Sequence, residues 1–401
     1  MEEKSKFHLR FIKKIIDTIG PRLPSSEEEN KAAELIAEEF EGVTGTPSTI
    51  EEFNCAPLAA IGSIPMYGYL ILFVLFPLYI FLPLVALILG LFVFFVAIAQ
   101  IFRYTGWFDF MFPQKTSRNV YSIVEPSSGT VDQTILIAGH IDSSWEWNLA
   151  LKNPERLWFK IPYGIIGGAL VIIMALYRLI TNNVTITLGN SWTIWIFIFF
   201  IPGWIYLARY LSWDKSKASP GAMDNLSGVS IALWVTDHLK KHPEKIPENT
   251  RIIVGAFGSE EAGTKGSQAF VKKHKNDLLQ NMWALIVDGV SDMDYFHVVE
   301  GDTWLGTKYD DDFCSMAQEA MQEQKVLPAT RIENPVGGSD SASFSRAGVR
   351  TVTLIAQNPT ATDYYHTHND TYDRLELLTL AIMDEIVLKL IQKIGKCVNK
   401  K

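Results

Sequence analysis

The chain has 401 residues, of which 48% are hydrophobic, and a formal net charge of -8 at pH 7. A net negative charge gives no sign of a nucleic-acid partner. The three cysteines (Cys55, Cys314 and Cys397) are scattered, odd in number and without a CxxC pair. They argue against a disulfide framework and fit a reducing compartment.

The first 56 residues predict two helices followed by a strand. The opening run MEEKSKFHLRFIKKIIDTIG lacks the uninterrupted apolar core of a signal peptide and indicates an amphipathic helix. Ser25 and Ser26, followed by Glu28 and Glu29, resemble a capping box that opens a second helix. The run TIEEFN then indicates a strand.

The next stretch has a different character, because residues 53–102 include no charged side chain. About 20 apolar residues cross a bilayer as a helix, so this run is long enough for two spans. Pro77 and Pro83 lie near its middle and suit a turn. We therefore predict a helical hairpin at roughly Ala59–Leu78 and Leu82–Phe102.

A second hairpin is predicted after a short return to polar sequence. The run FRYTGWFDFMFPQKTSR is basic and aromatic, as is typical of a membrane interface, and NVYSIVEP and TILIAGH indicate two strands. Ile161–Tyr177 and Leu179–Ala208 then lack charge and are separated by the polar loop TNNVTITLGN. The chain is therefore predicted to be a multipass membrane protein with four spans.

The distribution of lysine and arginine near the span ends predicts the orientation. On the far side of the spans only Arg178 is basic. On the globular side lie Arg103, Lys115, Arg118, Lys152, Arg156, Lys160, Arg209, Lys215 and Lys217. An even number of spans returns the chain to its starting side, so the globular parts are predicted to share one side, the cytoplasmic one.

After Ser219 the pattern is that of an α/β domain. Strands are predicted at RIIVGAF, WALIVDG, YFHVVE and TVTLIA. Helices are predicted at about 226–242, from about 267, at about 308–324 and at about 375–397. The two hairpins therefore look like insertions into one discontinuous domain.

One strand end carries a first chemical signal, in the run ILIAGHID. An apolar strand is followed by a glycine, His140 and Asp142. Ligands bind at the carboxyl ends of strands in open α/β sheets, and a metal-binding histidine needs a partner for its second ring nitrogen. A strand-end histidine beside a helix-capping aspartate remains the commoner explanation of this motif by itself.

Four further runs place carboxylates and histidines in loops that bound strands. Each has an ordinary explanation by itself, as turn chemistry, a solvated helix start or a helix cap. Together they offer the nitrogen and oxygen ligands that zinc accepts. The runs are SPGAMDNLSG with Asp224 and Asn225, AFGSEEAGTKGS with Glu260 and Glu261, LIVDGVSD with Asp288, and YYHTHNDT with His366 and His368.

In this order the motifs resemble those of the family-28 metallopeptidases, the co-catalytic di-zinc aminopeptidases with relatives such as glutamate carboxypeptidase and glutaminyl cyclase. The resemblance implies an α/β fold with a mixed, mostly parallel sheet flanked by helices. It covers a discontinuous zinc peptidase domain at residues 1–56, 114–144 and 219–401. The predicted first hairpin (57–113) and second hairpin (145–218) depart from the soluble members.

The resemblance implies a site for two co-catalytic Zn²⁺ ions. His140 and Asp288 would bind one ion, and Glu261 and His366 would bind the other. Asp224 would bridge the two. His368 is a rival ligand to His366, but the His-Thr-x-x-Asp-Thr spacing favours His366.

The resemblance also implies roles for residues around the metals. Glu260 would be the general base, and Asp142 would hold His140. Tyr365 is a candidate for stabilising the oxyanion, and Asp370 is a candidate for steadying the loop of His366. The Asp224–Asn225 peptide is expected to be cis.

Two other runs are expected near the site by the same resemblance. Ser339, Asp340 and Ser341 in GGSDSASF would form a substrate wall. Trp145–Trp147 follow His140 closely and lead into the second hairpin. They could anchor the chain at the interface or contact substrate, and the sequence does not decide between the two.

The leading functional interpretation is a membrane-bound zinc aminopeptidase that cleaves peptides with activated water and a glutamate base. Both hairpins enter beside catalytic segments, so hydrophobic peptides or amide-linked lipids could reach the site from the membrane. One alternative is an amidase acting on lipid or other small amides. A second is a non-catalytic membrane receptor or scaffold with a peptidase fold, and a single-zinc cyclase is a weaker one. The substrate, the native metal and the oligomeric state stay open.

Overall fold

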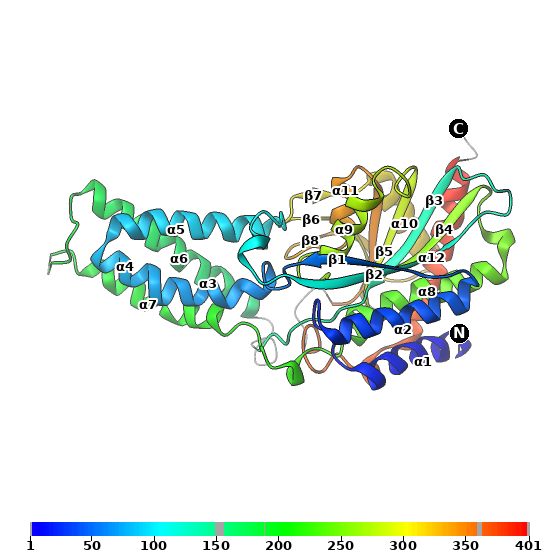
Figure 1. Cartoon of the computed structure of the whole chain (residues 1–401), viewed down its shortest axis with the longest axis horizontal. Helices are drawn as coiled ribbons and strands as arrows, with labels where there is room; N and C mark the ends of the chain where they lie inside the picture. Colours follow the sequence, from blue (N-terminus) through cyan, green and yellow to red (C-terminus); the bar gives the residue numbers. More distant parts are fainter. Residues whose placement is uncertain (1, 149–155, 188, 359–362, 399–401) are drawn as a thin grey trace.

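The computed structural model of the chain describes residues 2–148, 156–187, 189–358 and 363–398. The chain forms an α/β domain from which a bundle of apolar helices projects (Figure 1). The bundle is inserted into the domain at two places along the chain, before β2 and after β3. Lys152, one of the basic residues used to predict the orientation, lies outside the described residues.

The domain is built on one nine-stranded mixed sheet with the strand order β1-β2-β4-β3-β5-β9-β6-β7, and β8 pairs with β6. The four neighbours β4, β3, β5 and β9 run parallel, and antiparallel strands flank them on both sides. All eight residues of β3 are buried, as expected for a strand covered on both faces. The strands are β1 Thr49–Cys55, β2 Lys115–Val124, β3 Gln133–His140, β4 Thr250–Phe257, β5 Met282–Val290, β6 Phe296–Asp302, β7 Thr307–Lys308, β8 Pro328–Asn334 and β9 Arg350–Ala356.

Helices cover both faces of this sheet, so the expected α/β architecture is confirmed. One face packs against α1 Glu2–Ile19, α2 Glu27–Thr44, α8 Ser227–Lys241, α10 Asp311–Glu323 and α12 Leu377–Val398. The other face packs against α9 Lys265–His274 and α11 Ser341–Arg346. The short elements β7, β8 and α11 were not anticipated from the sequence, because none carries a long periodic pattern.

The amino-terminal cap of α2 also contacts the loop that follows β4. Ser26 caps the helix by accepting the backbone N–H of Glu29, and the Glu29 carboxylate accepts the N–H of Ser25. This resembles a capping box, except that the returning carboxylate binds the N–H of Ser25, one residue before the cap. Glu29 also accepts the backbone N–H of Ser259, so the cap reaches the loop that follows β4.

Four apolar segments form the projecting bundle (Figure 1). Three of them, Ile61–Phe81, Pro83–Phe102 and Phe159–Ile180, are long and apolar enough to cross a membrane. The fourth, Trp192–Ala208, is apolar but shorter. In helix labels, α3 Ile64–Leu70 and α4 Phe76–Phe81 make up the first segment, α5 Pro83–Ala97 lies in the second, and α6 Leu157–Ile180 and α7 Trp192–Ala208 are the third and fourth.

Pro77 and Pro83 were both expected in the turn between the first two spans, but only Pro83 lies there. Only Leu82 separates the two helices, and Pro83 begins α5. Pro77 lies inside the continuous helix Ile61–Phe81, two residues after its π-helical turn Ile71–Leu75, rather than in the turn between the spans. Prolines and π-helical turns are both recognised causes of irregularity within a helix.

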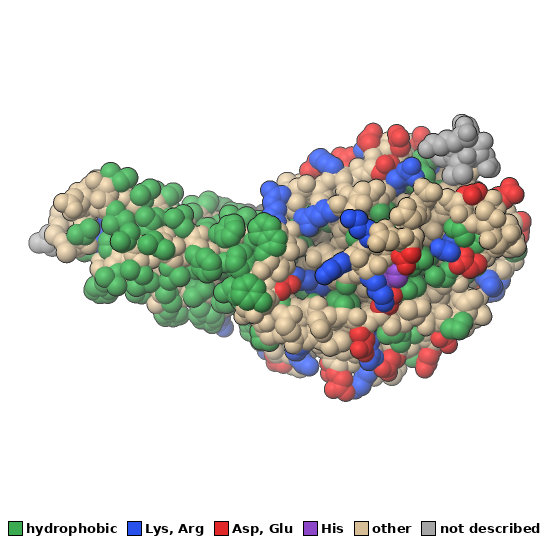
Figure 2. Space-filling model, turned by 45° about the horizontal axis from the view of Figure 1, so that its top comes forward, with side chains coloured by type: hydrophobic (Ala, Val, Ile, Leu, Met, Phe, Trp, Pro, Cys, Tyr) green, Lys and Arg blue, Asp and Glu red, His purple; other side chains and the backbone are tan. Residues whose placement is uncertain are grey.

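The bundle is close-packed inside and apolar outside. A Cβ at Gly68 would collide with the backbone of Ala208, and one at Gly164 would lie 2.8 Å from the Gly203 oxygen. Such small-residue crossings are typical of helices packed in membranes. Figure 2 shows hydrophobic side chains over the bundle and charged ones over the α/β domain. Exposed side chains include Phe73, Phe81, Ile88, Leu91, Phe95, Ile166, Ile173, Ile180, Trp195 and Phe199.

The single cation at the far end of the bundle, Arg178, is fully buried. Its guanidinium donates hydrogen bonds to the carbonyls of Tyr79 and Ile80 near the end of α4. It also donates to the carbonyls of Asn183 and Val184 in the distal loop. A cation at a helix carboxyl end opposes the negative pole of the helix dipole, so Arg178 caps the tip of the bundle.

Three buried polar residues resemble a hydrolytic triad. His8 Nδ1 lies 2.7 Å from Ser230 Oγ, and His8 Nε2 lies 3.1 Å from Asp384 Oδ2. All three residues are 0% exposed, so no substrate reaches them. They tie α1, α8 and α12 together.

Asp384→Ala is expected to lower the free energy of unfolding by about 2–3 kcal/mol, because it leaves Nε2 of the buried His8 ring without its partner. The neighbouring carboxylate of Glu385 is partly exposed and pairs with Lys4, so Glu385→Ala should cost less than about 1 kcal/mol. Thermal unfolding of the two variants measures the difference. Equal losses would contradict the structural role given to Asp384.

Candidate active site

The candidate site lies at the carboxyl ends of the central parallel strands, the edge at which α/β sheets bind ligands. His140 ends β3, the Glu260–Glu261 pair follows β4, and Asp288 lies near the end of β5. Gly139 allows this convergence, because a Cβ there would lie 2.7 Å from the backbone nitrogen of Val229 in α8.

The five predicted metal ligands come together in two groups that share Asp224. In the first group, His140 Nε2 lies 3.0 Å from Asp224 Oδ1 and 3.7 Å from Asp288 Oδ1. In the second, His366 Nε2 lies 2.9 Å from Asp224 Oδ2 and 3.1 Å from Glu261 Oε1. The candidate ligand atoms of each group lie within 4.8 Å of one another. The two oxygens of Asp224 therefore face different groups, as a bridging carboxylate requires.

The electrostatics of the site fit bound cations. Buried carboxylates gather there, and within the described chain Glu261 Oε1 and both oxygens of Asp340 have no hydrogen-bond partner. Burial lowers the pKa of His366, but the Glu261 and Asp224 carboxylates outweigh burial and raise it to about 10. Buried carboxylates are costly without cations, and two His-carboxylate groups form a donor set that zinc accepts.

Asp142 does more than the expected holding of His140. Its carboxylate accepts the backbone N–H groups of Glu260 and Glu261, each at 2.9 Å. Its Oδ1 lies 3.5 Å from His140 Nδ1, whereas the Asp142 backbone carbonyl lies closer, at 3.1 Å. Asp142 therefore joins the end of β3 to the loop after β4 and fixes the backbone positions of Glu260 and Glu261.

Asp370 holds the segment of the bridging carboxylate as well as its own loop. Its carboxylate accepts the backbone N–H groups of Met223 and Asp224, at 2.7 and 3.1 Å. Burial is the largest cause of a rise in the Asp370 pKa to about 7, although these two hydrogen bonds oppose it. The Asp224–Asn225 peptide is cis, as predicted.

His368 lies apart from both ligand groups. Its side chain is about half exposed, and its Nδ1 lies 3.3 Å from a Glu146 carboxylate oxygen. The geometry therefore favours His366 over His368 as the metal ligand.

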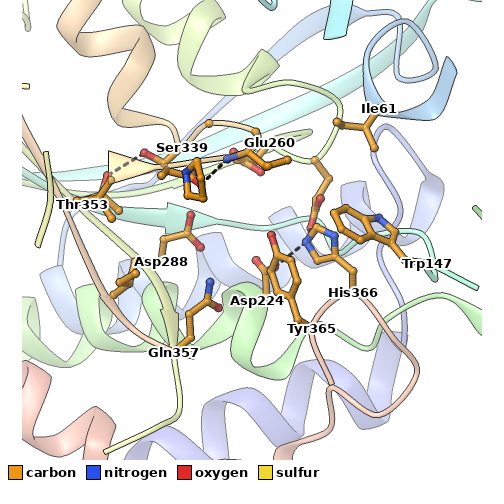
Figure 3. Close-up of a pocket in the computed structure, with 18 of the residues that line it drawn as sticks. Ile61, Trp147, Asp224, Glu260, Asp288, Ser339, Thr353, Gln357, Tyr365 and His366 are labelled. Atoms are coloured by element: carbon orange, nitrogen blue, oxygen red, sulfur yellow. Dashed lines mark hydrogen bonds and ion pairs between the residues drawn. The ribbon is translucent and has the colours of Figure 1, made fainter. Parts of the chain in front are cut away.

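A pocket opens over these groups, and Figure 3 shows Glu260, Asp288, Tyr365 and His366 around it. Glu260 lines the pocket but belongs to neither ligand group. Burial raises the pKa of the Tyr365 phenol well above its ordinary value, so the hydroxyl keeps its proton.

Ser339, Asp340 and Ser341 in GGSDSASF were expected to form a wall of the substrate pocket, but only Ser339 lines it. Ser339 lines the pocket, and its hydroxyl lies 2.8 Å from that of Thr353. Asp340 is buried behind it, and Ser341 turns to the hydroxyls of Thr351 and Thr353. The glycines before Ser339 contribute the rest of this stretch of wall.

Arg22 is a buried residue whose role the sequence did not reveal, although it stands in the stretch IGPRLP. Its guanidinium donates to the carbonyls of Ile141, Pro220 and Gly221 at 2.8 to 3.1 Å. It thereby ties the end of β3 to the segment before Asp224. The signal was an arginine between prolines at a helix end, which has too many ordinary explanations to stand out.

Trp147 packs directly on a candidate metal ligand. Its ring meets that of His366 edge to face at 4.3 Å, and its backbone N–H donates to the His366 carbonyl at 2.9 Å. His366 Nδ1 has no hydrogen-bond partner among the described residues, so on that side of the ring packing takes the place of a carboxylate. Since Trp147 also lines the pocket, it contacts the site rather than serving only as an interfacial anchor.

Trp147→Ala is expected to weaken zinc binding at the candidate group that contains His366 by about tenfold, because His366 loses a surface that orients it. Competition with a chromophoric chelator measures the affinity. Trp213→Ala is the matched control, since Trp213 is half exposed and is not among the pocket residues. An unchanged zinc affinity in Trp147→Ala would show that His366 holds its position without the indole.

A protein-family model matches the second half of the chain. Residues 212–391 match the model of peptidase family M28, a range that includes Asp224, Glu260, Glu261, Asp288 and His366. Among curated proteins, no sequence matches this chain.

Solved structures share the fold at low sequence identity. The zinc aminopeptidase BSAP from Bacillus subtilis is 15% identical, with a TM-score of 0.56 and coverage of 97% of this chain and 95% of that one. A glutaminyl cyclase from Bacteroides thetaiotaomicron, bound to N-acetylhistamine, is 15% identical, with a TM-score of 0.55 and 97% of each chain covered. A Zn-dependent exopeptidase from Parabacteroides distasonis is 12% identical, with a TM-score of 0.54 and coverage of 96% and 97%. Together, the family match and the shared fold support a zinc metallopeptidase.

Proposed function

We propose that this chain is a membrane-bound aminopeptidase that holds two zinc ions and hydrolyses the first peptide bond of its substrate. One observation carries the proposal: two groups of metal ligands share Asp224, and Glu260 stands beside them without belonging to either. In this assignment His140 and Asp288 hold one ion, and Glu261 and His366 hold the other.

The bound ions would polarise the scissile carbonyl and make water more acidic. The chain's own residues supply the other parts of the reaction. Glu260 accepts a proton from the attacking water and passes it to the leaving nitrogen as the C–N bond breaks. The products are a carboxylate and a free amine. The Tyr365 hydroxyl lines the pocket and donates a hydrogen bond to the carbonyl oxygen as negative charge develops on it.

The charge of the pocket supports action at an amino terminus. Its described lining includes no lysine or arginine. The terminal carboxylate of a carboxypeptidase substrate would therefore lack a cationic side chain to pair with, whereas a substrate cleaved at its amino terminus needs none.

The helical bundle supports a place in the membrane. Helices of 20 to 22 residues reach about 30 Å, the thickness of a bilayer's hydrocarbon core. The exposed face of the bundle is apolar, and at its junction with the α/β domain Trp107 and Trp213 are exposed, as at a membrane interface. The described basic residues Arg103, Lys160 and Arg209 lie at the same end, which supports a cytoplasmic α/β domain.

A hydrolysis screen with full-length protein in detergent tests the function. Free peptides should release their first amino acid, activity should disappear with a chelator, and zinc should restore it. Amino-terminally acetylated peptides should resist cleavage. Release of fatty acids from acyl amides in place of amino acids from peptides would establish the amidase. If the protein holds two zinc ions per chain and hydrolyses none of these compounds, the alternative of a non-catalytic receptor or scaffold would be established.

A further inference from the structure

The substrate pocket is bounded on one side by the ends of the apolar helices. Ile61 stands at the start of the first apolar segment, and Ile161 lies in the first turns of α6. Tyr104 follows the second segment by two residues, and Tyr210 follows α7 by two residues. A residue in, or two residues beyond, the domain-facing end of each of the four segments therefore lines the pocket.

We call Ile61, Tyr104, Ile161 and Tyr210 the outer wall of the pocket, and neighbouring side chains hold it in place. Ile61, Ile161 and Trp147 pack against a buried cluster that contains Trp145 and Tyr210. The rings of Trp147 and Tyr210 lie 5.1 Å apart. The wall therefore connects His366, through Trp147, to residues that begin or end membrane helices (Figure 3).

The wall opposite combines apolar and uncharged polar side chains. Its apolar members include Val299 from β6, Ile332 from β8 and Ile355 from β9, together with Val336. Its polar members include Asn334, Ser339, Thr353 and Gln357. The charged groups of the pocket are confined to the candidate metal ligands and Glu260. A substrate in this pocket therefore places its reacting amide over carboxylates and the rest of its surface between the apolar helix ends and this uncharged wall.

We propose that the substrates are membrane-held peptides, whose apolar part passes over the outer wall formed by Ile61, Tyr104, Ile161 and Tyr210 into the bilayer. The proposal rests on the aminopeptidase function above. The outer wall stands at the junction of the apolar bundle and the charged α/β domain (Figure 2), so a peptide anchored at the bilayer surface reaches the site without leaving the membrane. Apolar surface buried against the wall favours such substrates over water-soluble ones.

The test uses full-length protein in phosphatidylcholine vesicles and two peptides that differ in one group. Both are Leu-Ala-Lys amides, with the lysine side chain carrying palmitoyl in one and acetyl in the other, and leucine release is measured. The palmitoyl peptide partitions into vesicles, so any membrane enzyme would meet it at a higher local concentration. A preference of the wild type for this peptide therefore does not test the outer wall, whereas variants of the wall do. The wall variant is Ile61→Ala with Ile161→Ala. The control is Ile166→Ala with Ile173→Ala, two residues of α6 that are exposed on the apolar face.

The wall variant is expected to raise KM for the palmitoyl peptide by about tenfold and for the acetyl peptide by less than about twofold. The control variant should match the wild type on both. Equal changes in KM for the two peptides, or none, would overturn the proposal while leaving the aminopeptidase function intact. If wild-type protein with two zinc ions releases leucine from neither peptide, the aminopeptidase function itself fails, and release of palmitate would indicate the amidase.

Discussion

Glu260→Gln is expected to lower kcat by about a thousandfold while both zinc ions stay bound, because glutamine keeps the shape of the side chain but cannot accept a proton. The structure allows this separation of effects because Glu260 belongs to neither ligand group. Zinc content by atomic spectrometry and kcat on a leucine-initiated peptide are the two measurements.

The matched control for Glu260→Gln stands one residue further along the chain. Glu261 Oε1 lies 3.1 Å from His366 Nε2, so Glu261→Gln removes a charged ligand and is expected to lower the zinc content instead. The two backbone N–H groups are held by the same carboxylate, that of Asp142, so the variants differ only in which side chain changes. A Glu260→Gln protein that retains more than about a tenth of the wild-type kcat would show that another group acts as the base.

Arg22→Leu is expected to lower the free energy of unfolding by about 4 kcal/mol or more. The substitution leaves the carbonyls of Ile141, Pro220 and Gly221 without their donor in the interior. It also removes a buried cation that interacts favourably with the carboxylates of Asp142 and Asp370. Thermal unfolding of zinc-free protein measures the loss without a contribution from metal binding.

Arg251→Leu is the control for this substitution, because it removes an arginine from the same domain. The guanidinium of Arg251 pairs with Glu125 at the surface, and the loss should stay below about 1 kcal/mol. Equal melting temperatures for Arg22→Leu and wild type would show that water replaces the arginine as donor to these carbonyls.

Much of the secondary structure followed from local patterns. Apolar periodicity predicted α8 and α12, and the serine-glutamate signal predicted the start of α2, now found with Ser26 as its cap. The uncharged runs predicted the four apolar segments. Pro77 was misassigned because a proline favours a turn in most sequences, whereas here it lies within a continuous helix just after a π-helical turn.

The candidate site residues were recognised from the sequence as a set of motifs. Their positions relative to one another depend on the tertiary structure. No spacing in the sequence shows that the two oxygens of Asp224 face different histidines, or that Asp142 binds the backbone of both glutamates. These contacts join segments more than 80 residues apart, and they depend on the order of strands in the sheet. Arg22 and Trp147 are further examples, because their roles consist of contacts with distant parts of the chain.

By itself, the sequence predicted which residues would carry the chemistry, which runs are apolar enough for a bilayer, and where most helices and strands lie. These properties depend on residue type and on neighbours in the chain, and the family resemblance also implied how the ligands divide into two groups. The tertiary structure alone decided the packing of Trp147 on His366 and the meeting of residues from the domain-facing ends of all four apolar segments at the pocket. The physical reason is that such contacts depend on how parallel strands and inserted helices converge, and the chemistry of a local run does not specify that convergence.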